Sequence, residues 1–136
     1  MFFEEHAKLL SDFARVSQAA GARADYVQGG GGNTSVKLPG GLMAIKASGF
    51  CLSDICPDKA YAVLDGADLR IFYLTTEPSA LADVEKEGSA RAKADVRHID
   101  GLADLRPSVE AGFHLILKTF VVHTHSVYAN LAACST

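Results

Sequence analysis

Thr119-Phe120-Val121-Val122-His123-Thr124-His125-Ser126 is the stretch that decides how this sequence folds. Its first four residues are β-branched or aromatic, a composition that favours an extended backbone. Side chains at positions i and i+2 of a strand point to the same side, so we predict that His123 and His125 face one pocket. Two imidazoles held in this way can bind a divalent metal such as zinc. Two half-buried histidines satisfied by hydrogen bonds would give the same pattern.

The segment Pro107-Ser108-Val109-Glu110 lies upstream and precedes a predicted helix over residues 111–118. Ser108 is a favourable N-cap, and Glu110 would lie in the first turn, where a carboxylate complements the helix dipole. Alternatively, the helix brings Glu110 to the two histidines, as a ligand or as a base whose pKa the ion adjusts. His114 shares the helical face of Glu110, and we interpret it as a packing residue.

A third group of residues is suited to an anion. Residues 29–32 are all glycine, which allows the backbone to approach a ligand closely, and Asn33-Thr34-Ser35 adds short polar side chains. A flexible linker is the alternative. Lys46-Ala47-Ser48-Gly49 is a second, smaller anion-binding turn. Lys37 and Lys46 could supply positive charge, although we expect each to be a solvated strand residue. No dinucleotide or Walker fingerprint is present.

Composition restricts the class of protein. The chain has 136 residues, of which 49% are hydrophobic and 21% charged, enough for one core. A net charge of −3 argues against nucleic-acid binding. The three cysteines match no metal or redox pattern and are typical of a reducing compartment. We see no signal peptide and no apolar run of the ~20 residues that span a bilayer, and therefore expect a cytoplasmic protein without a membrane partner.

Periodicity and turn residues predict an α/β protein of the α+β type. The expected architecture is a layered sandwich in which helices cover a central, mostly antiparallel sheet. Helices are predicted at 2–20, at 78–97 with a break at Gly88, at 111–118 and from Ser126 onward. Strands are predicted at 35–38, 42–46, 61–64, 69–73 and around 119–125, with turns at 39–41 and 65–66.

Four segments stand in a meaningful order: Gly-Gly-Gly-Asn-Thr-Ser-Val-Lys at 30–37, Lys-Ala-Ser-Gly at 46–49, Pro-Ser-Val-Glu at 107–110 and Val-Val-His-Thr-His-Ser at 121–126. In this order they resemble the class II aldolase/adducin family, and within it the aldolases that cleave rhamnulose or fuculose 1-phosphate. The resemblance implies one domain of this type over residues 1–136. It also implies truncation at the C-terminus, because the family's third metal-binding histidine lies further downstream than Thr136.

The resemblance also implies roles for individual residues. It implies that the substrate phosphate contacts Gly32, Asn33, Ser48, Gly49 and Ser108. It implies that Glu110 is the catalytic acid/base. The implied zinc site includes His123, His125 and Glu110. The implied activity is a zinc-dependent lyase that cleaves a ketose 1-phosphate to dihydroxyacetone phosphate and an aldehyde, in a homotetramer. A sugar-phosphate epimerase or dehydratase on the same scaffold, or a non-catalytic adducin-like assembly module, is the alternative.

Overall fold

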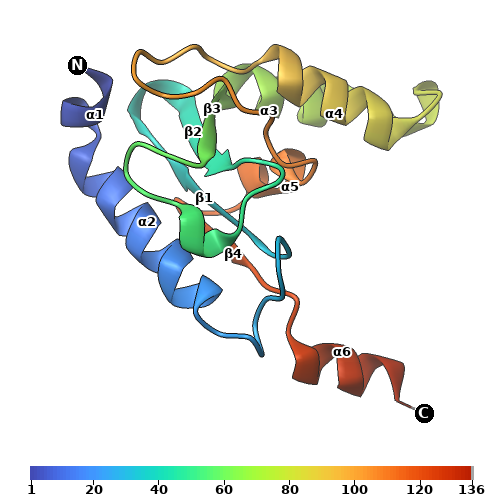
Figure 1. Ribbon diagram of the computed structural model, residues 1–136. Coiled ribbons are helices and arrows are strands. Elements are labelled where there is room, and N and C mark those ends of the chain that lie inside the picture. The colour runs from blue at the N-terminus through green and yellow to red at the C-terminus, as the bar shows by residue number, and fades with distance from the viewer. Residues whose placement is uncertain (136) are drawn as a thin grey trace.

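Four antiparallel strands form the centre of the structure in the order β3-β2-β1-β4 (Figure 1). The computed structural model describes residues 1–135. The strands are β1 (Asn33–Lys37), β2 (Leu42–Lys46), β3 (Tyr61–Asp65) and β4 (Phe120–His123). The predicted β1–β2 hairpin is confirmed, and its turn is the short 3-10 segment η1 (Pro39–Gly41). Gly40 and Gly41 have φ angles of 77° and 80° there, which glycine adopts readily.

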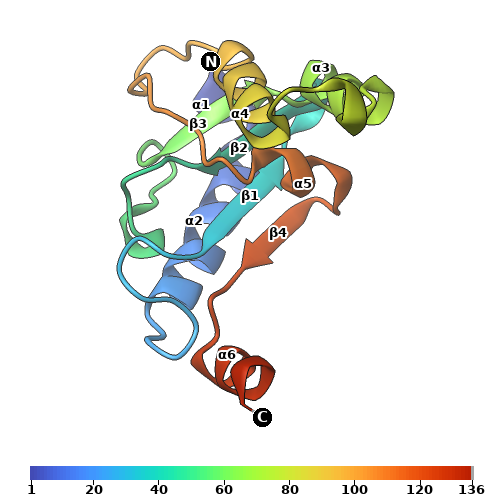
Figure 2. The same cartoon turned by 90° about the vertical axis from the view of Figure 1, so that its right-hand side faces the viewer.

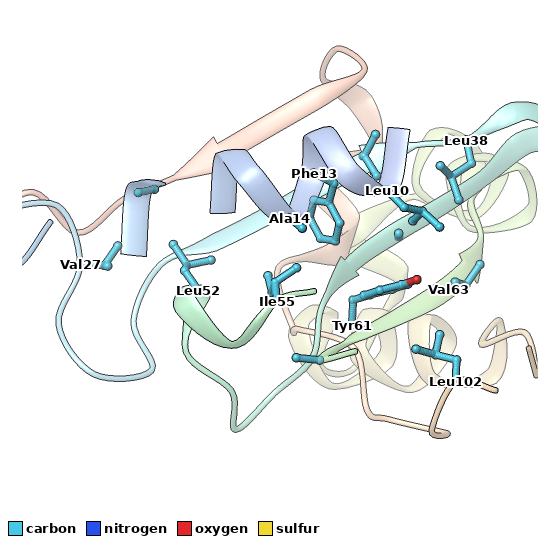
Figure 3. Close-up of a cluster of buried hydrophobic side chains, with 14 residues drawn as sticks. Leu10, Phe13, Ala14, Val27, Leu38, Leu52, Ile55, Tyr61, Val63 and Leu102 are labelled. Atoms are coloured by element: carbon cyan, nitrogen blue, oxygen red, sulfur yellow. The ribbon is translucent and has the colours of Figure 1, made fainter. Parts of the chain in front are cut away.

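The helices α1 (Phe2–Glu5) and α2 (Ala7–Gly21) lie on one face of the sheet. Figure 3 shows Leu10 and Phe13 of α2 directed toward Tyr61 and Val63 of β3, and the Phe13 and Tyr61 rings meet edge to face at 5.7 Å. The 3-10 segment η2 (Leu52–Asp54) adds Leu52 to this core. The predicted helix over residues 2–20 is therefore confirmed, with an interruption at His6 between α1 and α2.

The other face of the sheet carries α3 (Gly66–Thr75), α4 (Val84–Ala94) and α5 (Ala111–Ile116). A second core forms here, and its buried members include Met43, Ile45, Leu64, Leu69 and Leu115. Both faces of the central strands are covered, since four of the five residues of β1 are buried. The predicted layered sandwich with an antiparallel sheet is confirmed.

The prediction of a strand over residues 69–73 is wrong, because this segment belongs to α3. The Asp-Gly pair at 65–66, taken as a hairpin turn, begins the helix instead, and the Asp65 carboxylate accepts a hydrogen bond from the Asp68 backbone N–H. Leu69 then packs fully buried against the second core. The apolar residues of this short run fit either periodicity, and packing decided between them.

The helix predicted over residues 78–97 divides into η3 (Pro78–Ala80) and α4, and α4 continues through Gly88 without a break. A Cβ at Gly88 would collide with the Tyr73 hydroxyl, and one at Gly112 with the Tyr73 ring. Gly88 is therefore needed for the packing of α3 against α4, and it does not end the helix.

The last element is α6 (Val127–Cys134), which begins after Ser126 as predicted. The Ser126 hydroxyl caps it by accepting the Ala129 backbone N–H. The helix extends away from the sheet in both views (Figures 1 and 2), and none of its residues is buried. Among residues 1–135, no helix combines the length and the apolar character needed to cross a bilayer.

The contact between Gly88 and Tyr73 yields a test of the packing of α4. Gly88→Ala should lower the free energy of unfolding by about 1–3 kcal/mol, because overpacking exceeds the gain of about 1 kcal/mol in helix propensity. In a Tyr73→Phe background the colliding hydroxyl is gone, and the penalty should shrink or reverse. Urea denaturation of the four proteins measures this coupling. An equal penalty in both backgrounds would contradict the contact.

Candidate metal and anion site

One face of β1 positions the site, because Asn33, Ser35 and Lys37 all point toward the segment that begins α5. The Asn33 amide donates to Glu110 Oε2 at 3.0 Å. The Ser35 hydroxyl lies 2.8 Å from His114 Nδ1, and the Lys37 ammonium donates to the His114 carbonyl. These three side chains alternate with Thr34 and Val36, which face α2, so a single strand serves both layers.

Glu110 stands at the cap position of α5, because the helix begins at Ala111, two residues later than an N-cap at Ser108 would place it. The Ser108 hydroxyl accepts the Glu110 backbone N–H at 3.3 Å. The Glu110 carboxylate turns toward the sheet, with Oε1 3.1 Å from His123 Nδ1. Burial raises the pKa of Glu110, but the hydrogen bond from Asn33 and the contact with His123 outweigh it, so the pKa is below its ordinary value.

The two histidines of the His-x-His segment lie side by side. β4 ends at His123, so His125 lies just beyond the strand, and the prediction that the strand includes it is wrong. The two rings still approach, with centroids 5.0 Å apart. The register pairs His123 with Asn33 across the sheet, on the face that carries Glu110. His125 is exposed and lies against Gly31, where a Cβ would be 2.9 Å from its Nδ1.

Glu110, His114 and His123 form a group that could hold a metal ion, because one ligand atom from each lies within 4.8 Å of the others. Within residues 1–135, His114 Nε2 is a buried ring nitrogen that makes no hydrogen bond, and the buried His123 Nδ1 has the Glu110 carboxylate as its polar neighbour. Two imidazoles and a carboxylate are a donor set that catalytic zinc uses. Glu110 and His123 offer this set either with His114 or with His125, whose ring adjoins that of His123, so the residues present fit a divalent ion. His125 is not a member of this group.

His114 is the residue whose role sequence reasoning placed least well. Its side chain is fully buried, as a packing residue would be, but it lies beside Glu110 and makes a polar contact with Ser35. Burial, with a smaller effect from Lys37, lowers the pKa of His114 to about 4, so the ring is neutral near pH 7. The spacing of four residues from Glu110 was the available signal.

A cavity of about 250 Å³ is lined both by the residues that the resemblance implies for phosphate binding and by two that it implies for the metal site. Gly32, Asn33, Ser48, Gly49 and Ser108, together with Glu110 and His125, line this one cavity. Two loops meet to form it, because the Ser48 backbone N–H donates to the Arg106 carbonyl at 2.9 Å and its hydroxyl donates to the Pro107 carbonyl at 3.2 Å. Ser48 and Ser108 therefore come from segments that are joined directly.

Lys46 also lines this cavity, and the expectation that it is a solvated strand residue is wrong. Its side chain is buried, and its ammonium donates to the Phe50 carbonyl at 2.7 Å and the Gly30 carbonyl at 3.2 Å. It makes no ion pair with any carboxylate of the part of the chain that the structure describes. Burial lowers the pKa of Lys46, while Cys51 and Glu110 oppose this. A cation without a paired carboxylate suits an anion-binding cavity.

The fold and the cavity define an α/β domain with adjoining candidate sites for a metal and an anion. The family model of the Class II Aldolase and Adducin N-terminal domain matches residues 11–136. This chain therefore belongs to the class II aldolase/adducin N-terminal domain family. No protein of curated function matches it significantly.

Two solved structures share the fold. One is the N-terminal class II aldolase domain of a conserved protein from Thermoplasma acidophilum, with a TM-score of 0.75 and 24% identity. The other is YgbL from Escherichia coli, a proposed aldolase/epimerase/decarboxylase, with a TM-score of 0.59 and 21% identity. Each similarity covers 93% of this chain, which spans 59% of the first structure's chain and 48% of the second's.

The burial of Lys37 on β1 predicts how the stability of the fold depends on pH. Burial, and then the nearby Arg70, lower the pKa of Lys37 from 10.5 to about 8. Between these pH values the unfolded chain binds a proton that the folded chain does not, so this residue makes stability rise with pH. Lys37→Met should lose this rise between pH 8 and 10 when unfolding by urea is compared with wild type. Lys118→Met, at an exposed position, is the matched control. A slope unchanged by Lys37→Met would contradict the prediction.

Proposed function

We propose that this chain carries the substrate-binding residues of a metal-dependent aldolase-type lyase that cleaves a ketose 1-phosphate to dihydroxyacetone phosphate and an aldehyde. One observation carries the proposal: the Glu110 carboxylate, held by Asn33 and next to His123, lines the same cavity as Lys46 and the two serine loops. Membership of the class II aldolase/adducin family supports it.

Two chemically different groups of residues line the cavity, which suits a substrate that carries both a phosphate and a carbonyl. Lys46, Ser48 and Ser108 supply a cation and hydroxyls, and the glycines at 30–32 leave the backbone open to a phosphate. Glu110 and His125 stand with them in the same lining, and His123 adjoins Glu110. A phosphate bound by the first group would direct the carbonyl of the sugar toward the second.

The residues around Glu110 would then have distinct tasks. His123 and His125 would hold the ion, zinc or another divalent metal, with Glu110 beside it. When bound, this ion supplies Lewis-acid stabilisation of the negative charge that develops on the substrate oxygens. Glu110 Oε1 or Oε2 would remove or return the proton at the carbon next to the substrate carbonyl. Asn33, which donates to Oε2, would keep the carboxylate turned toward that carbon.

A related reaction is the second candidate, because the same base and ion would serve an epimerase or a dehydratase. The similarity to YgbL, for which aldolase, epimerase and decarboxylase activities are proposed, supports this second candidate function. The products distinguish the reactions, since only cleavage releases dihydroxyacetone phosphate. An adducin-like assembly module would bind neither metal nor sugar phosphate. We further propose a cytoplasmic homo-oligomer, a tetramer by resemblance, as the working form.

Glu110 is the residue to change first. Glu110→Gln keeps the size of the side chain and removes the base, so turnover should fall ~10²–10⁴-fold while bound zinc changes little. Release of dihydroxyacetone phosphate from rhamnulose 1-phosphate and fuculose 1-phosphate, and zinc content of the same samples, are the measurements. Glu77→Gln, at an exposed position away from the cavity, is the control. Wild-type turnover in Glu110→Gln would refute the base, whereas loss of zinc would make Glu110 chiefly a ligand.

Lys46 provides a test that does not depend on turnover. Lys46→Met removes the cavity's ammonium, and a charge-assisted hydrogen bond contributes about 1.5–3 kcal/mol, so inorganic phosphate should bind at least ~10-fold more weakly. Isothermal titration with phosphate, at one fixed salt concentration, measures the change. Lys59→Met removes the same charge at an exposed position outside the cavity and should bind phosphate as wild type does. Equal losses in both variants would assign the effect to net charge alone.

A further inference from the structure

His114 is a buried histidine whose two ring nitrogens have different surroundings. Nδ1 lies 2.8 Å from the Ser35 hydroxyl, whereas Nε2 is buried and meets no hydrogen-bond partner in residues 1–135. One nitrogen of this ring is within 4.8 Å of both a Glu110 carboxylate oxygen and a His123 nitrogen. Because Ser35 contacts Nδ1 and Nε2 has no other partner, we infer that Nε2 is the nitrogen that faces this group. The position of the ring proton therefore decides what His114 can do.

Ser35 determines that position. Its side chain is buried, and the described residues offer its hydroxyl no partner other than His114. A hydroxyl has one proton to donate, and Nδ1 can accept it only when that nitrogen carries no proton of its own. The opposite arrangement would leave the buried hydroxyl proton unsatisfied. It would also leave an Nε2 lone pair beside the Glu110 carboxylate, where a donor is favoured. Both conditions place the ring proton on Nε2.

We propose that His114 is a positioning residue for Glu110: Ser35 fixes it in the Nε2–H tautomer, which donates toward the Glu110 carboxylate and does not bind the metal. A ring nitrogen that carries a proton has no lone pair for a metal. The ion of the proposed site is thus left to His123 and His125, with Glu110 beside it. The catalytic part of this inference rests on the proposed function, but the tautomer does not.

The backbone supports the placement of the ring. The Lys37 ammonium donates to the His114 carbonyl, and the His114 backbone N–H donates to the Glu110 carbonyl at 3.4 Å. Glu110 and His114 are one helical turn apart, and Asn33 and Ser35 are two residues apart on β1. Two side chains of the strand therefore engage two side chains of the helix in register. Asn33 holds the carboxylate from one side, and His114 approaches it from the next turn.

The decisive experiment reads the tautomer directly. Long-range ¹H–¹⁵N spectra of the ¹⁵N-labelled full chain at pH 7.5 should show a protonated Nε2 and an unprotonated Nδ1 for His114, with and without zinc. His114→Gln identifies the signals. In Ser35→Ala the Nε2–H form should no longer predominate, and Ser35→Thr, which keeps the hydroxyl, should restore it. A proton on Nδ1 in wild type, or a shift of Nε2 to a metal-bound position with zinc, would overturn the proposal.

Zinc content and kinetics give a second, separate readout. His114→Gln should keep the zinc content of wild type, whereas His123→Ala should lose it. Where cleavage is measurable, His114→Gln should lower kcat ~10-fold with little change in KM, since Glu110 is less well oriented. Loss of zinc in His114→Gln would overturn the proposal. If wild type neither binds zinc nor turns over, the proposed function fails, and the tautomer still decides the role of Ser35 and His114.

Discussion

The polar face of β1 is the constraint on which the rest of the site depends. Three side chains on a central strand, Asn33, Ser35 and Lys37, are buried or half-buried under a helix where apolar residues would be usual. Burying polar groups is costly unless they find partners. Each of the three side chains makes one hydrogen bond to Glu110 or His114, and Asn33 Oδ1 is the atom among them that has no partner in the described residues. The start of α5 is thus fixed on the sheet by hydrogen bonds, which are directional, and Glu110 is fixed with it.

This constraint couples the register of the sheet to the chemistry of the cavity. His123 is paired with Asn33, so a slip of one residue between β1 and β4 would put the two side chains on opposite faces of the sheet, and only one of them could then face Glu110. If β1 were the strand that turned over, Val36 would also leave the core on the α2 side. Stability and site geometry therefore use opposite faces of one strand, and the apolar core beneath α2 holds the register that the candidate site needs.

Sequence reasoning succeeded where the local pattern determines the structure, as for the β1–β2 hairpin, α2 and the segment ending in His123. The segment that became α3 was missed because Asp65 serves equally as a turn residue and as a helix cap. Of the site residues that the resemblance implied, all but His123 line one cavity, and their roles stay predictions. The burial of Lys46 and the contact between Ser35 and His114 could not be predicted, because they join segments that are distant in sequence or depend on loop closure.

The charges around the cavity explain why, under the proposed function, the catalytic base Glu110 needs a metal ion beside it. The lowered pKa of Glu110 keeps it ionised near pH 7, and a carboxylate repels negative charge that develops on a substrate beside it. Two like charges about 4 Å apart repel by about 4 kcal/mol at an effective dielectric of 20. Lys46 is held by the Gly30 and Phe50 carbonyls, and under the proposal its charge serves the phosphate. The negative charge that develops beside Glu110 needs a cation of its own, and neutral imidazoles are side chains that can bind one without adding negative charge.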